Sequence, residues 1–263
     1  MLGKLFKHEM QETAKLLLPL CLIVIAATLL GAVFIQTGLF ENPHLTTIAA
    51  IYMILYVFSI FALFILSAVY LMIRFYKTMY SSQGYLTHTL PVSSFAVLNT
   101  KILSALIWLI SVAAICILSV MILVFNAAGY PDSASINNII DGISTVFNLP
   151  FAAATCLIVV SILIFYLSAI LMIYTCFSIG QLFGQYRIPA AIVAYVLLYI
   201  IQQIVSLVSL FIFGITVFDN VNIEQSDIFY RHIMLLLVTE SAVFSAAYYS
   251  ICQYITKKRL NLE

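Results

Sequence analysis

Charge is what this sequence has least of. Asp, Glu, Lys and Arg make up 8% of its 263 residues, whereas a soluble domain carries about 25%. A water-soluble fold of this length needs a polar surface that the chain lacks, so lipid must solvate most of its surface. In lipid only helices or a closed barrel satisfy the backbone. The net charge of +1 gives no indication of nucleic-acid binding.

Motifs of catalysis and metal binding are lacking as well. The sequence holds no GxxxxGK[ST] loop, no HExxH, no GxSxG and no acidic pair within an apolar run. We therefore expect no ATPase, hydrolase or metal centre in this chain, and assign no catalytic or metal-binding residue. The five cysteines lie in apolar runs and form no CxxC pair, which predicts small buried apolar residues rather than a disulfide framework.

Long apolar runs are what the sequence has in abundance. Apolar residues make up 64% of the chain and form continuous runs of 20 residues or more, whereas barrel strands alternate over about 10 residues. The sequence therefore predicts an all-α membrane protein with six transmembrane helices in a single membrane domain over residues 1–263. The predicted spans are 16–40, 46–73, 102–125, 151–182, 188–218 and 228–255.

Two segments outside these spans are also expected to be helical. Residues 1–15 predict an interfacial helix, since Leu2, Leu5, Phe6 and Met10 fall near one face; the alternative is a frayed tail. Pro19 would then lie in the first turn of the first span, where proline is tolerated. In the outer loop at 126–150, isoleucines at helical spacing predict a short surface helix capped at Ser133 or Ser135. The alternative there is an irregular loop.

Basic residues are distributed unevenly between the two predicted membrane faces. Ten of the eleven fall on the side shared by both termini, and only Arg231 falls on the other. This positive-inside bias predicts that both termini are cytosolic. The ten are Lys4, Lys7, Lys15, Arg74, Lys77, Lys101, Arg187, Lys257, Lys258 and Arg259.

The segment between the second and third spans, 74–101, is expected to be a cytosolic connector. Gly84 and Pro91 interrupt it, and Ser93 or Ser94 predicts the start of the next helix. A compact helix–break–helix of this kind suits a lever that rests against a soluble partner. The alternative is an ordinary interhelical loop, although the segment is long for one.

Three polar side chains within the spans are candidates for a translocation path. Glu240 lies inside the sixth span, where a charge costs about 2.5–3.5 kcal/mol on insertion scales. It is either a coupling or substrate-contacting acid, or a residue that joins helices by hydrogen bonds. Gln202 and Gln203 lie mid-way along the fifth span and carry the same two readings. Gly180 and Gly184 form a GxxxG pattern that favours close helix packing.

Two stretches carry a resemblance to a known family. RFYKTMYSSQGYLTHTLPVS (74–93), followed by a helix starting near Phe95, resembles the permease subunit of type-2 ABC exporters of Gram-positive bacteria. SIGQLFGQYRIPAAIVAY (178–195) is similar to the inner end of the fourth helix and the start of the fifth in that group.

The resemblance implies a function, partners and a docking element. It implies two permeases, this chain with a second copy or a paralogue, and two ATP-binding subunits that hold ATP and Mg²⁺, with no cofactor on this chain. The coupling residues would be Gly84, Tyr85, Leu86, Leu90 and Pro91, seated on the ATPase.

We therefore expect the chain to be the membrane subunit of an ATP-driven exporter in a bacterial cell membrane. It would move an amphipathic peptide, lipid or drug and leave hydrolysis to its partner. The alternatives are a substrate-capture subunit of a small-solute importer and an ion-coupled transporter that uses Glu240.

Overall fold

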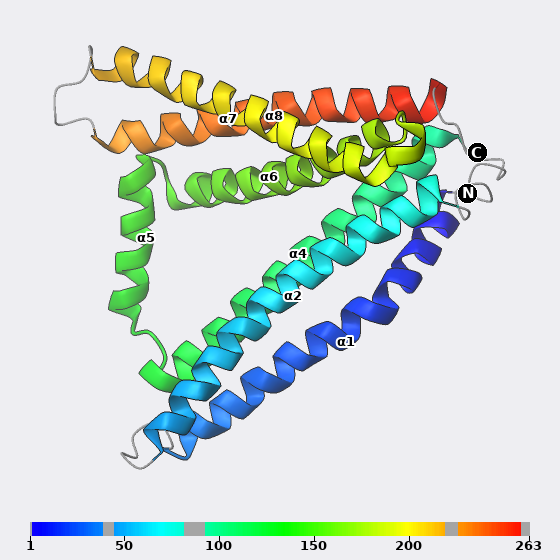
Figure 1. The fold of residues 1–263 in the computed structure, drawn as a ribbon. Coiled ribbons are helices and arrows are strands. Elements are labelled where there is room, and N and C mark those ends of the chain that lie inside the picture. The colour runs from blue at the N-terminus through cyan, green and yellow to red at the C-terminus, as the bar shows by residue number, and fades with distance from the viewer. Residues whose placement is uncertain (1, 39–44, 82–92, 219–225, 259–263) are drawn as a thin grey trace. The chain divides into compact units, whose positions relative to one another are not determined.

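The computed structural model describes residues 2–38, 45–81, 93–218 and 226–258, and within these ranges all regular structure is helical (Figure 1). Within the same ranges, six helices are long and apolar enough to cross a membrane, which confirms the predicted all-helical class and agrees with six candidate spans. The helices are α1 (Leu2–Gln36), α2 (Thr46–Tyr80), α4 (Ser94–Ala128), α5 (Ser133–Phe147), α6 (Phe151–Gly180), the short 3₁₀ helix η1 (Gly184–Tyr186), α7 (Arg187–Phe218) and α8 (Ser226–Lys258).

The N-terminal helix differs from the expectation. α1 is continuous from Leu2 to Gln36, with no break between residues 15 and 16. Pro19 therefore lies inside the helix rather than in its first turn, where it removes one backbone hydrogen bond and crowds the carbonyl four residues earlier. The interfacial position of residues 1–15 stays a prediction.

Two helices reach further toward the connector than their predicted spans. α2 continues to Tyr80 and α4 begins at Ser94, so only residues 81–93 separate them. Ser93 caps α4, since its hydroxyl accepts a hydrogen bond from the Ala96 amide at 3.3 Å. At 1.5 Å per residue, the 35 residues of each helix span about 52 Å, well beyond the hydrocarbon core of about 30 Å.

The chain divides into two compact units. The single membrane domain expected from the sequence stays a prediction. The first unit comprises residues 1–78 and 91–132, and in it α1 packs along α4. Its apolar core consists of Cys21, Val24, Leu63 and Val112. The Tyr52 hydroxyl donates to the Ala27 carbonyl at 2.8 Å and so ties α2 to α1.

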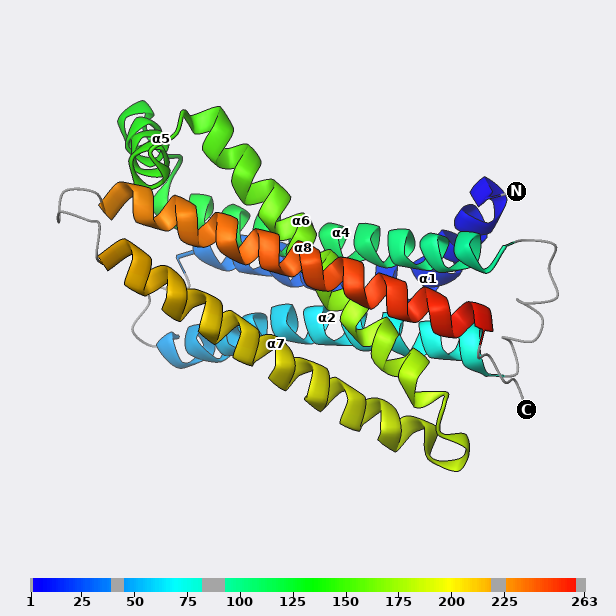
Figure 2. The same ribbon diagram turned by 90° about the horizontal axis from the view of Figure 1, so that it is seen from above.

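The second unit comprises residues 79–90 and 133–263. Within it α6 packs against both α7 and α8, and the Thr175 hydroxyl of α6 donates to the Tyr248 carbonyl of α8 at 2.9 Å. Figures 1 and 2 show α5 running crosswise to α6 and α8. The helix predicted from isoleucine spacing is thus confirmed as α5, while its place on the outer membrane surface stays a prediction.

Only one glycine of the GxxxG pattern, Gly180, lies at a close contact between helices. A Cβ on Gly180 would lie 2.6 Å from the Arg187 carbonyl oxygen and 2.8 Å from the Ala191 Cβ, whereas a Cβ on Gly184 would meet nothing within 4 Å. Of these two glycines, only Gly180 lies where α6 and α7 approach too closely for a side chain.

Four of the five cysteines are fully or partly buried as predicted. Cys156 is exposed, so the prediction was wrong for this position, because an apolar run in a membrane helix has a lipid-facing side as well as a protein-facing one.

Candidate functional site

A cavity of about 270 Å³ lies in the second unit, bounded by α6, α7 and α8. Its walls are mostly apolar and aromatic, with a few polar side chains among them, which is typical of small-molecule sites. Glu240 is the one charged residue in the lining. The lining residues are Phe165, Ser168, Ala169, Met172, Ile173, Tyr195, Tyr199, Gln202, Ser206, Leu237, Glu240 and Ser241.

One face of α7 supplies the polar and aromatic wall of this cavity. Tyr195, Tyr199, Gln202 and Ser206 follow one another at intervals of four, three and four residues, which places them along one side of a helix. Ser209 continues the same row beyond the cavity. The sequence analysis missed this row, although its spacing was visible in the sequence.

Two serine hydroxyls hold the Glu240 carboxylate from across the helix interface. Ser206 donates to one carboxylate oxygen, and Ser209 donates to the other at 3.1 Å. A carboxylate accepts about four hydrogen bonds, so acceptor capacity remains for a ligand. Glu240 therefore joins α8 to α7 and also presents a charge to the cavity. The two interpretations from the sequence, an acid that contacts substrate and a residue that joins helices by hydrogen bonds, are compatible.

The two neighbouring glutamines of α7 have different surroundings. Gln202 lines the cavity and its side-chain carbonyl accepts a hydrogen bond from the Tyr248 hydroxyl at 3.2 Å. Gln203 is exposed on the helix surface, because consecutive helical residues point about 100° apart. The structure thus brings Gln202 and Glu240 together and leaves Gln203 outside the cavity.

No ion pair neutralises Glu240 within the described part of the chain. The ion pairs found there involve Glu9 and Glu12 as the acids, and the Glu240 carboxylate accepts hydrogen bonds from neutral hydroxyls. A carboxylate that is half-buried in a helix this apolar needs a cation, a proton or water beside it. The cavity is the space in which such a partner would reach it.

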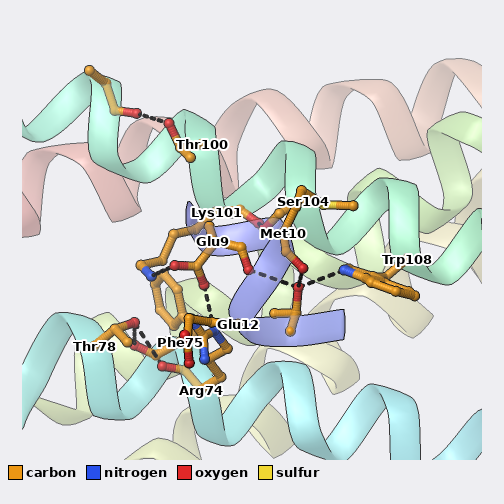
Figure 3. A network of polar contacts seen from close by, with 12 residues as sticks. Glu9, Met10, Glu12, Arg74, Phe75, Thr78, Thr100, Lys101, Ser104 and Trp108 are labelled. Carbon is orange, nitrogen blue, oxygen red and sulfur yellow. Dashed lines mark hydrogen bonds and ion pairs between the residues drawn. The ribbon is translucent and has the colours of Figure 1, made fainter. Parts of the chain in front are cut away.

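A second polar cluster lies in the first unit, at the end where α1 and α4 begin and α2 ends (Figure 3). The Glu9 carboxylate lies between two cations. Arg74 Nε donates to one oxygen at 2.7 Å and Lys101 Nζ donates to the other at 3.0 Å. The three side chains are 13%, 17% and 7% exposed, respectively, so this cluster is largely desolvated.

The same end of the first unit holds a further link between α1 and α4. Trp108 Nε1 donates to the Thr13 hydroxyl at 2.6 Å, and the hydroxyl in turn donates to the Glu9 carbonyl at 2.8 Å. The sequence analysis counted Arg74 and Lys101 only as cytosolic charges and missed their shared partner. Glu9 could have indicated this cluster, because it is one of few acids on a membrane face that is otherwise basic.

The predicted coupling residues are not part of the described structure. Gly84, Tyr85, Leu86, Leu90 and Pro91 lie within residues 82–92, outside the described residues. The helices that flank this segment are described, and the Glu9 cluster joins α1 to both of them.

The fold and the cavity define a multi-pass helical membrane protein with a carboxylate-bearing cavity between three of its spans. Comparisons of the chain with protein families, with curated proteins and with solved structures find no match. Within the described residues, no three His, Cys, Asp or Glu side chains lie close enough together to hold a metal ion.

Proposed function

We propose that the chain is the membrane permease subunit of an ATP-driven exporter, and that it carries an amphipathic substrate through the second unit. The observation that carries the proposal is the cavity bounded by α6, α7 and α8, where Gln202, Ser206 and Glu240 stand among apolar and aromatic walls. Such a lining suits a substrate with both an apolar body and a polar group.

The energy source in this proposal is an ATP-binding subunit on a separate chain. The resemblance of residues 74–93 to exporter permeases supports a docking element centred on Gly84, Tyr85, Leu86, Leu90 and Pro91. The length of α2 and α4 supports it too, since each helix is about 52 Å long and therefore extends beyond a hydrocarbon core of about 30 Å. Closure of two ATPases would then move the helix ends as rigid bodies.

The arrangement in the membrane follows from the same proposal. The ten of eleven basic residues on the face shared by both termini support a cytosolic position for that face, and the cell membrane would be bacterial. A second permease, either a copy of this chain or a paralogue, would complete the membrane core. ATP and Mg²⁺ would bind only to the partner.

The exporter proposal is tested by transport into inside-out vesicles from the native host, prepared with and without the chain. The probes are a fluorescent amphipathic peptide, a fluorescent phospholipid and a drug-like dye. We expect at least one probe to accumulate only when the chain and ATP are both present. This accumulation should persist when a protonophore is added. If no probe accumulates in vesicles that contain both the chain and ATP, the proposal is contradicted.

The same assay addresses the second candidate, an ion-coupled transporter, which the unneutralised Glu240 carboxylate favours. Accumulation that is driven by an imposed proton gradient, without ATP, and abolished by the protonophore would support this candidate instead. Movement of a small solute in the opposite direction would support the importer subunit.

A further inference from the structure

We infer that the cavity between α6, α7 and α8 is a binding site for a small organic monocation with an apolar body, whose charged group pairs with Glu240. The inference names the substrate class of the proposed exporter, and its transport role rests on that proposed function. The binding site itself rests on the lining residues of the cavity.

Glu240 has no cation of the described chain beside it to balance its charge. Glu240 is the one charged residue lining the cavity, and none of the ion pairs in the described chain involves it. The hydroxyls of Ser206 and Ser209 orient both carboxylate oxygens but bring no positive charge. A single positive charge is therefore what the site lacks, and a bound cation would supply it.

Glu9 differs from Glu240 in this respect. In the first unit the chain supplies its own cations, and the Glu9 carboxylate has Arg74 at 2.7 Å and Lys101 at 3.0 Å. The buried acid that joins α1 to α2 and α4 is thus neutralised by cations of the chain itself. Glu240 instead faces a cavity, and in place of cations it has hydroxyls.

Aromatic and apolar side chains make up much of the remaining cavity lining. The rings of Tyr195 and Tyr199 lie nearly parallel, with an interplanar angle of 10° and a centroid separation of 6.3 Å, and both line the cavity. Aromatic faces attract ammonium groups and also accept apolar groups. Phe165, Met172 and Leu237 add apolar surface, so a ligand with a charged end and an apolar body matches the lining.

The size of the cavity limits the ligand as well. A volume of about 270 Å³ lies just below the range of about 300–1,000 Å³ that is usual for ligand cavities, so only a small ligand fits. A dication would leave one charge without a partner, because a single carboxylate lines the cavity. A small monocation, such as an aryl-alkyl ammonium, therefore fits both the volume and the charge.

The test uses the full chain in lipid nanodiscs without any ATPase and two matched probes. The first is 3-phenylpropyl-trimethylammonium, and the second is its uncharged isostere with carbon in place of nitrogen. We expect saturable binding of the cation and at least tenfold weaker binding of the isostere, equivalent to about 1.4 kcal/mol. Equal binding of the two probes to the unaltered chain, or no binding of the cation, would overturn the inference.

Variants then assign the charge to Glu240. E240Q keeps the shape of the side chain and is expected to weaken cation binding at least tenfold while leaving the isostere unaffected. Q202E/E240Q returns a carboxylate to the same cavity and is expected to recover most of the affinity. Q203E/E240Q returns it to the exposed face of α7 and is expected to recover none. Cation binding that survives E240Q would overturn the inference.

Failure here is distinguishable from failure of the exporter proposal. The binding assay contains neither ATP nor a partner, whereas the vesicle assay scores ATP-driven movement of any amphipathic probe. Transport without cation binding would leave the exporter standing and reject the cation as its substrate class. Cation binding without ATP-driven transport would keep the site and reject the exporter.

Discussion

Changing Glu9 to Gln is expected to lower the free energy of unfolding by about 3 kcal/mol. The change leaves Arg74 and Lys101 together without an anion, and their side chains are only 17% and 7% exposed. Removing one partner of a buried ion pair costs about 3–5 kcal/mol, because the remaining charge stays desolvated. We take the lower value since Glu9 lies only seven residues from the start of α1, where water is close. Denaturation in mixed micelles measures the loss.

Two matched variants separate this effect from a general loss of surface charge. E12Q removes the exposed pair that Glu12 makes with Lys15 at 2.6 Å, and an exposed pair contributes about 0–1 kcal/mol. E9Q/K101M removes the more deeply buried cation as well and should recover at least 1 kcal/mol relative to E9Q, by the same desolvation argument. Equal losses for E9Q and E12Q would show that the Glu9 cluster is not desolvated.

Changing Gly180 to Val is expected to destabilise the second unit by about 3 kcal/mol. The added Cβ would lie 2.6 Å from the Arg187 carbonyl oxygen and 3.0 Å from the Ala191 amide nitrogen. Both are backbone atoms, so α6 and α7 must separate to make room. Overpacking of this kind costs about 1–3 kcal/mol. We expect the upper value because the Arg187 oxygen and the Ala191 nitrogen belong to the α7 backbone, which cannot move aside as a side chain can. The thermal midpoint in nanodiscs measures the effect.

The matched control is Gly184, four residues along the same pattern. No atom lies within 4 Å of a Cβ built there, so G184V should change stability by at most about 0.5 kcal/mol. If the two variants melt together, the close approach of α6 and α7 at Gly180 is not a stabilising contact.

The membrane helices could be predicted from the sequence because lipid imposes a single requirement. Any run of about 20 apolar residues must form a helix to satisfy its own backbone. The fourth and fifth spans were therefore expected at 151–182 and 188–218, close to the observed Phe151–Gly180 and Arg187–Phe218. Hydropathy could not show that α1 continues through residue 15, because helix continuity depends on local backbone preference and not on hydropathy.

The cavity was only partly predictable, for a different physical reason. Glu240 and Gln202 could be singled out because a polar side chain in an apolar span is costly wherever it points. Gln203 carries the same cost but lies on the exposed face of α7. The pairing of Ser206 with Glu240 joins residues 34 positions apart, and helix rotation and packing bring them together. A single sequence does not encode that rotation as a local pattern.

We propose that an ATPase on a separate chain drives transport by this protein, and co-purification tests this proposal most directly. Tagged chain is isolated from its native membrane, and the eluate is assayed for ATP hydrolysis and for a co-purified ATP-binding subunit. We predict that the unaltered chain brings down such a subunit with ATPase activity, and that L86D/L90D loses both while keeping the same melting temperature. Because the sequence holds no GxxxxGK[ST] loop, we predict that the activity belongs to the partner. An intact, folded chain that brings down no ATPase would contradict the account.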